Sequence, residues 1–294
     1  MGLESNALLA LTAAVLWGGG DFSGGMGVKR AGGTVGAALR VVLLSHLMSF
    51  TALSGLALLR GDAFPHGLAL ATGIGSGVMG GLSLTMFYIA LSRGAMGTSA
   101  AVSGLLAAAI PAAVSMSREG WPGMHRVLGF VVAGAAIWLI AAGENPESVT
   151  ADARTTWMAI LAGAGFGIYF VGLKITSSAG LVWPMATARI GSLTTCSLVL
   201  LAVQAATRGR GIGAARIHPA VVRWAASTAL LDTCGNLLFM AATRAGRLDV
   251  AAVLASLYPA STIMLAAWTL HERPTRRQSI GMVLAVAAVA MITL

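Results

Sequence analysis

Charged residues are scarce in this chain. Asp, Glu, Lys and Arg make up 10% of its 294 residues, whereas a soluble domain carries about 25%. Hydrophobic residues account for 57%, and the mean hydropathy is +0.83. A soluble chain of this composition could not cover its own surface with polar groups. The composition therefore excludes an ordinary soluble domain and predicts a protein that crosses a membrane many times.

Cysteine is also rare. Cys196 and Cys234 both stand inside apolar runs, which indicates small buried side chains rather than a disulfide or a metal site. We expect no metal and no cofactor. Gly75, Gly77 and Gly80 spell G-x-G-x-x-G, but a dinucleotide-binding loop must follow a strand. These glycines stand in the middle of an apolar run, so we interpret them as helix-packing residues.

Basic residues outnumber acidic ones, and the formal net charge is +9. They stand in short gaps between apolar runs, where membrane proteins carry them for orientation, so we expect no nucleic-acid partner. Most of them fall on the side opposite the N-terminus. The positive-inside rule then places both termini outside the cell.

Apolar runs long enough to span a bilayer, about 20 residues each, follow one another along the whole chain. A span inside lipid must satisfy its own backbone, so we expect helices. The gaps at 143–155 and 207–221 are too short to hold a soluble domain. The predicted fold is an all-α membrane protein with ten transmembrane helices, at 6–27, 34–59, 67–91, 97–116, 125–142, 156–175, 184–206, 222–243, 248–270 and 276–293.

The second half of the chain repeats the first. Residues 1–145 and 155–294 each hold five predicted spans. Because five is odd, the second half must enter from the opposite face, which predicts two inverted five-helix repeats with a site between them. The matched positions are Arg40 with Arg189, Arg93 with Arg244, Pro111 with Pro259, Pro122 with Pro274, and Gly129 with Gly281.

Two motifs carry a resemblance to a known family. The first is W-G-x-x-D-F at residues 17–22, and the second is P-x(12)-E-R-P-x(3)-Q-x(2)-G, formed by Pro259, Glu272, Arg273, Pro274, Gln278 and Gly281. With ten spans in two halves, the chain resembles the EamA family of the drug/metabolite transporter (DMT) superfamily. The first half departs from the second motif, because Pro111 and Glu119 stand five residues closer together than the pattern requires.

The resemblance implies secondary transport, commonly export, of amino acids or other small metabolites across the cell (inner) membrane. It also implies a central cavity lined by the first, third, fourth, sixth, eighth and ninth helices. The family expectation for the termini is opposite to the one from the Lys and Arg count, so the orientation stays open. Substrate, coupling ion and oligomeric state also stay open.

Asp232 is the sharpest candidate for substrate binding, because an ionisable residue near the membrane midplane is costly. Asn236 lies one turn further on the same helix face, and the matched face of the third helix carries Thr85 and Tyr88. These groups suit a zwitterionic or cationic metabolite, and the carboxylate could also carry a coupling proton. The alternative is that Asp232 is a structural acid bonded to a neighbouring helix.

Other ionisable residues have competing interpretations. Asp21 lies at the same predicted depth as Arg40, which favours a structural ion pair. The alternative places Asp21 in the substrate site together with Trp17, one turn earlier. Because Arg189 matches Arg40, we interpret both as structural charges, with Arg189 reaching to the membrane interface. His46 has no matched partner and is predicted to be a packed histidine.

Aromatic residues and prolines complete the predicted site. Trp17, Tyr169 and Tyr258 lie on helices expected to line the cavity, where a ring could stack on a substrate. Core packing is the alternative for each ring. Pro111 and Pro259 break the backbone ladder of their helices and are predicted hinges, although a static bend would leave the same signature.

The sequence thus predicts a secondary active transporter that works by alternating access on a small-molecule substrate. A proton gradient is one candidate for the driving force. An intramembrane enzyme is a weaker interpretation, because it needs a nucleophile–base pair or a set of metal ligands inside the membrane. A non-transporting sensor or scaffold is the third interpretation.

Overall fold

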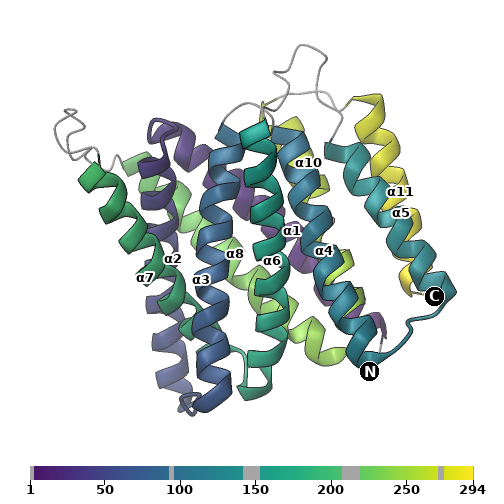
Figure 1. Ribbon diagram of the computed structural model, residues 1–294, viewed down its shortest axis with the longest axis horizontal. Coiled ribbons are helices and arrows are strands. Elements are labelled where there is room, and N and C mark those ends of the chain that lie inside the picture. The colour runs from purple at the N-terminus through teal and green to yellow at the C-terminus, as the bar shows by residue number, and fades with distance from the viewer. Residues whose placement is uncertain (1–2, 93–95, 142–152, 207–218, 271–274, 294) are drawn as a thin grey trace.

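Helices build the whole of the described structure (Figure 1). The computed structural model describes residues 3–92, 96–141, 153–206, 219–270 and 275–293, and no strand occurs among them. The helices are α1 (Leu3–Arg30), α2 (Val35–Arg60), α3 (Gly67–Ser92), α4 (Met96–Glu119), α5 (Met124–Ala141), α6 (Ala153–Thr176), the 3-10 turn η1 (Ser177–Ala179), α7 (Val182–Ala206), α8 (Pro219–Ala245), α9 (Leu248–Ala255), α10 (Tyr258–Leu270) and α11 (Arg276–Thr293).

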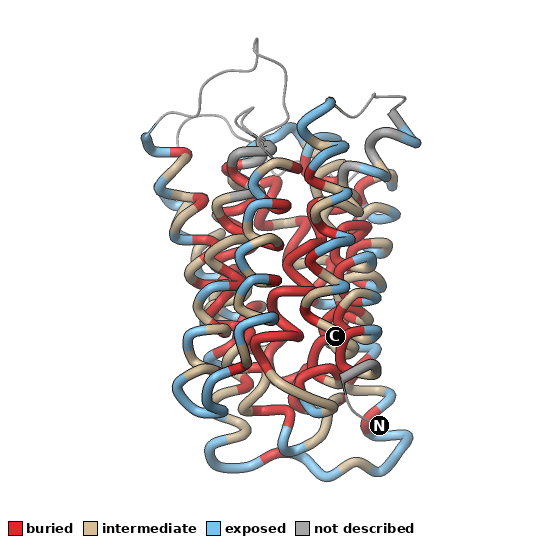
Figure 2. The backbone as a smooth tube through the Cα atoms, turned by 90° about the vertical axis from the view of Figure 1, so that its right-hand side faces the viewer, coloured by how far each residue is buried: buried red, intermediate tan, exposed pale blue. Residues whose placement is uncertain are grey.

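Seven of these helices are long and apolar enough to cross a membrane, namely α1, α2, α3, α6, α7, α8 and α11. The other predicted spans correspond to α4, α5 and the pair α9–α10, which run alongside them in the bundle (Figure 1). Large apolar side chains such as Leu59 and Trp268 are exposed on the outside, while the buried residues gather in the middle (Figure 2). The chain is therefore an integral membrane protein.

The predicted ninth span, 248–270, is not one helix but two. A turn at Ser256 and Leu257 separates α9 from α10, and Pro259 is the second residue of α10. Proline lacks an N–H and its ring collides with the carbonyl four residues earlier, which is Ala255, so α9 ends there. The predicted break of the backbone ladder at Pro259 is present, and it divides the predicted span into two helices. Pro111 does lie inside a continuous helix, α4.

Helices from the two halves of the sequence interleave. α1 packs on α8, α3 on α6 and α7, α2 on α7, and α5 on α11. Glycines permit the closest of these contacts. A side chain at Gly77 would overlap the Ala188 carbonyl, and one at Gly191 would overlap the Ile74 carbonyl. The backbones of α3 and α7 thus touch, as small residues allow in a membrane bundle. Gly77 has the packing role predicted for it, whereas Gly75 faces open space.

Candidate functional site

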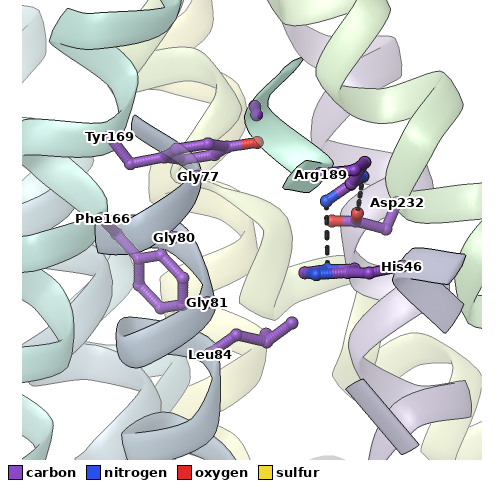
Figure 3. A pocket seen from close by; sticks show the side chains of 10 residues that line it. His46, Gly77, Gly80, Gly81, Leu84, Phe166, Tyr169, Arg189 and Asp232 are labelled. Atoms are coloured by element: carbon purple, nitrogen blue, oxygen red, sulfur yellow. Dashed lines mark hydrogen bonds and ion pairs between the residues drawn. The ribbon is translucent and has the colours of Figure 1, made fainter. Parts of the chain in front are cut away.

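A buried ion pair lies in the interior of the bundle. Asp232 is the central residue of α8, which has 27 residues. Arg189 of α7 reaches it, with Nη2 donating to Asp232 Oδ2 at 2.5 Å (Figure 3). The Arg189 side chain is 4% exposed, so the prediction that it reaches to the interface is wrong. Its guanidinium turns inward because Asp232 and Ser49 supply acceptors there, the latter at 2.9 Å from Nε.

His46 of α2 completes this arrangement. Its Nε2 lies 3.0 Å from Arg189 Nη1 and its Nδ1 lies 2.7 Å from Ser192 Oγ. A guanidinium can only donate, so Nε2 must be the acceptor and carry no proton. Ser192 Oγ donates to the Arg189 carbonyl, which leaves it free to accept from Nδ1–H. The hydrogen bonds therefore define a neutral imidazole with its proton on Nδ1.

A small cavity opens beside the ion pair. Two walls enclose it, and Figure 3 shows them facing each other. We call His46, Arg189 and Asp232 the polar wall. We call the residues from α3 and α6 the glycine–aromatic wall, which consists of Gly77, Gly80, Gly81, Leu84, Phe166 and Tyr169.

The cavity volume is about 30 Å³, and Ala188 lies beside the polar wall. A water molecule needs about 10–15 Å³ by this measure, so the space holds a few waters. A metabolite would not fit in it. The conformation described is therefore closed around its polar centre.

Tyr169 joins the two walls. Its hydroxyl donates to Asn236 Oδ1 at 2.8 Å, and Asn236 Nδ2 donates to Asp232 Oδ1 at 3.0 Å. Gly80 makes room for the ring, because a Cβ there would lie 3.0 Å from it. The structure thus brings together three of the predicted site residues, Asp232, Asn236 and Tyr169, from two different helices.

Asp21 lies on α1, which packs on α8 next to Asp232, since a Cβ at Gly20 would lie 3.4 Å from the Asp232 backbone nitrogen. It is half-buried and close enough to Asp232 to interact with it electrostatically. Tyr88 and Tyr258 belong to the same neighbourhood, since both interact electrostatically with Asp21. The Tyr88 hydroxyl lies against Gly24 of α1, and Tyr258 hydrogen-bonds with Ser103.

The predicted ion pair between Asp21 and Arg40 is wrong. Both residues are described, and no carboxylate among the described residues lies within 4.0 Å of the Arg40 guanidinium. The physical reason is the packing of the helices, because α2 lies mainly against α7 and α8 rather than along α1. Matching depth along two helices does not bring their side chains together.

Two further predicted residues pack away from the cavity. Trp17 stacks on Phe170 with ring centroids 5.0 Å apart and also packs on Phe239. Thr85 donates to the Gly81 carbonyl at 2.8 Å, and its hydroxyl lies 3.7 Å from Cys196 Sγ. The structure therefore favours the packing interpretation for both side chains. Thr85 does not line the cavity, which α3 borders mainly through its glycines, whereas Tyr88 interacts electrostatically with both Asp21 and Asp232.

The second family motif lies near the end of the chain. The residues of it that the structure describes have structural roles. Thr275 precedes α11, and its N–H donates to Gln278 Oε1 at 2.8 Å, while Gln278 N–H donates to Thr275 Oγ1 at 3.3 Å. This reciprocal pair is a capping box that starts the helix. Gly281 packs on Ile140 of α5. The remaining predicted positions, Arg93, Glu272, Arg273 and Pro274, lie outside the described residues.

No metal-ligand set gathers in the part of the chain that is described: no three His, Cys, Asp or Glu side chains stand together there. What the fold and the site do define is an apolar helical bundle with charged groups and a small cavity inside it. In a membrane protein, intramembrane charges of this kind are the first candidates for a functional site.

Residues 153–294 match the EamA-like transporter family, which belongs to the DMT superfamily. The resemblance seen in the sequence is confirmed over residues 153–294, and that family consists of membrane transporters of the DMT type. A solved structure titled "Crystal structure of protein" shares the fold, with a TM-score of 0.73 and 16% identity over 98% of this chain and 96% of its own. No curated protein matches the sequence.

Proposed function

We propose that this protein is a secondary active transporter that exports small metabolites across the cell inner membrane by alternating access. One observation carries the proposal. A hydrogen-bonded ion pair borders a cavity at the centre of α8, about 20 Å from either end of that helix at 1.5 Å per residue. Charges so deep in an apolar bundle are costly to keep, and binding a polar solute gives them a use.

Reciprocal contacts support two inverted five-helix repeats, 1–145 and 155–294. Gly129 of α5 packs on Ile292 of α11, and Gly281 of α11 packs on Ile140 of α5. Ile140 stands eleven residues after Gly129, and Ile292 stands eleven residues after Gly281. Each contact is thus repeated with the two halves exchanged, which is what a two-fold axis produces.

A second pair of contacts is also repeated with the two halves exchanged. Ser23 of α1 hydrogen-bonds Ser227 of α8 at 3.0 Å. Gly172 of α6 packs on Ser76 of α3, so closely that a side chain on the glycine would overlap the serine hydroxyl. α1 begins and α11 ends in the lower half of the bundle, as an even number of spans requires (Figure 1). These observations favour ten spans around a central pseudo-two-fold axis.

At one end of the bundle, which we call the tied end, hydrogen bonds join a segment of the first half to a segment of the second half. Arg247, between α8 and α9, donates to the carbonyls of Glu119 at 3.1 Å and Gly120 at 2.8 Å, both at the end of α4. The Leu248 N–H donates to Glu119 Oε2 at 3.3 Å. In alternating access this end opens when the opposite end closes, so these bonds must break in each cycle.

The two prolines are placed to permit that movement. Pro111 lies inside α4, which ends at the tied end, and Pro259 opens α10 directly after the turn at Ser256 and Leu257. We propose that α10 tilts against α9 about this turn. Pro111 serves as the corresponding hinge in the first half.

Flux measurements test the proposal. The purified protein is first screened by thermal shift against amino acids, nucleosides, sugars and amines, since a ligand that binds only the folded state raises apparent stability. Each ligand found is then loaded into proteoliposomes, with and without a pH gradient, beside protein-free vesicles. We expect protein-dependent flux that saturates. Binding without flux of any ligand, under a gradient or in exchange, would contradict transport and favour a sensor.

A further inference from the structure

Some hydrogen-bonding groups that line the cavity are not used within the protein. They indicate which hydrogen-bonding groups a ligand must supply. On the polar wall most of the donors are already engaged. Four of the five N–H groups of Arg189 are used, by Nε for Ser49, by Nη1 for His46 and by Nη2 for both Asp232 and Thr233. His46 donates its single proton to Ser192 and accepts from Arg189. One Nη1 N–H of Arg189 is left over, but the Arg189 side chain is 4% exposed and offers a ligand little access.

The acceptors are in the opposite situation. Asp232 accepts one hydrogen bond on each side-chain oxygen, from Arg189 and from Asn236. A carboxylate offers about four lone-pair positions, so about half of its capacity is unused. The Tyr169 hydroxyl spends its proton on Asn236 and keeps its own lone pairs. A ligand in the cavity thus meets acceptors.

The two partners of the ion pair also differ in exposure, and the acid is the more exposed of the two. The Asp232 side chain is 23% exposed, against 4% for Arg189. The guanidinium is covered by the groups that it binds, and the carboxylate faces the space. A ligand carboxylate entering this cavity would therefore meet like charge rather than Arg189.

Acidic side chains outnumber basic ones around the cavity. Asp232 and Asp21 contribute two carboxylates, which are close enough to interact, and Arg189 contributes one positive charge. His46 is neutral because its Nε2 must accept from Arg189. The other groups facing Asp21 are the phenols of Tyr88 and Tyr258. A cation placed beside the two acids would let both of them carry their charge at once.

The opposite wall supplies aromatic surface. The rings of Phe166 and Tyr169 border the cavity across from the ion pair (Figure 3). Aromatic faces attract ammonium groups and also pack against alkyl groups. A cation with an apolar body matches all three features, because it donates hydrogen bonds, adds one positive charge and contacts the rings.

We propose that the transported substrate is a small monovalent amine, bound as its ammonium ion against Asp232 and Asp21, and that zwitterions and carboxylates are poor ligands. This inference rests on the proposed transport function and deepens it. The cavity must widen to admit the alkyl body of the amine. The tied end around Glu119 and Arg247 is one place where that opening begins.

Four compounds with one branched alkyl body provide the test. Isoamylamine is a cation, isovaleramide is neutral, isovalerate is an anion and leucine is a zwitterion at pH 7. Their affinities for the purified protein are measured by calorimetry, and the series is repeated with propylamine, propionamide, propionate and β-alanine. We expect the amine of each set to bind at least about tenfold more tightly than its relatives. Equal or tighter binding of a zwitterion or carboxylate, or no amine binding, would overturn the inference.

Single substitutions test which acid binds the amine. Asp21→Asn leaves the pair of Arg189 and Asp232 intact, and we expect it to weaken amine binding about tenfold. Asp232→Asn is expected to weaken it further, provided that the variant still unfolds cooperatively. Arg40→Gln is the matched control and keeps wild-type affinity. Wild-type affinity in folded Asp21→Asn would overturn the assigned role of that acid.

The two proposals fail differently. Flux of a non-cationic solute without amine binding would remove the substrate class and leave the transporter. Amine binding without any flux would leave the site and remove the transport.

Discussion

The two walls of the cavity hold their shape by different means. The polar wall is a hydrogen-bonded set drawn from α2, α7 and α8, in which each side chain fixes the next. The glycine–aromatic wall is held by close contact, because Gly77 and Gly81 bring α3 against α7 and Gly80 admits the ring of Tyr169. One wall carries all the charge and the other carries the surface against which a ligand packs.

Two arginines show how the charged groups differ between the two halves of the chain. Arg40 and Arg189 occupy matched positions in the two halves, but only Arg189 is paired with an acid in the described structure. The position in α3 that matches Asp232 is Gly81, which has no side chain. The chain thus has an arginine at both positions and an acid beside one of them. The wall with the acid is the one that we connect with function.

Replacing each of the two arginines in turn gives the largest expected difference in stability between the two halves. Arg189→Ala leaves Asp232 buried without its partner, so we expect a loss of about 3–5 kcal/mol in stability. Arg40→Ala removes no ion pair and should cost about 0.5 kcal/mol. Thermal or denaturant unfolding in detergent measures both. Equal losses would show that the Arg189 network adds nothing that Arg40 lacks.

Glycine substitutions test the opposite wall. Gly77→Ala forces a methyl group onto the Ala188 carbonyl, and overpacking of this kind costs about 1–3 kcal/mol. Gly75 lies two residues earlier on the same helix and has nothing within 4 Å of an added Cβ. Gly75→Ala is therefore the matched control and should be neutral or slightly stabilising. Similar unfolding temperatures for the two variants would contradict direct contact between α3 and α7.

The bond that joins the two walls should have the smallest effect. Tyr169→Phe leaves Asn236 Oδ1 without its donor and should cost about 0.5–1.5 kcal/mol. Tyr88→Phe is the comparison, because the Tyr88 hydroxyl lies against Gly24 and interacts with Asp21 electrostatically, with no side-chain hydrogen bond among the described residues. We expect Tyr88→Phe to unfold at nearly the wild-type temperature. A larger loss in the Tyr88 variant than in the Tyr169 variant would invalidate this assignment.

Much of the fold could be predicted because it follows from periodic and repeated features. Apolar runs place the helices, and proline and glycine positions match between the halves. The break before Pro259 was also available from sequence, since the ring excludes a helical hydrogen bond to Ala255. What the sequence did not give is which faces of the helices meet. The absent bond between Asp21 and Arg40 depends on α2 packing against α7.

The site could be predicted in part for the same reason. Asp232 and Asn236 stand one turn apart, so their contact is local. Arg189 and His46 are 143 positions apart, and nothing in the sequence indicates that they bond. The signal for Arg189 was present, because a charged residue five positions inside a span needs a partner. His46 carried no such signal, since a neutral histidine fits either a packed or a functional position.

Closure of the cavity by a bulky side chain tests most directly whether this cavity is the transport site. Leu84 lines it on α3, and Leu68 on the same helix is 71% exposed on the outside. The measurement is flux of an identified substrate into proteoliposomes that contain Leu84→Trp or Leu68→Trp, each verified to unfold cooperatively. The account predicts that Leu84→Trp abolishes flux and that Leu68→Trp keeps the wild-type rate. A folded Leu84→Trp variant that transports at the wild-type rate would contradict it.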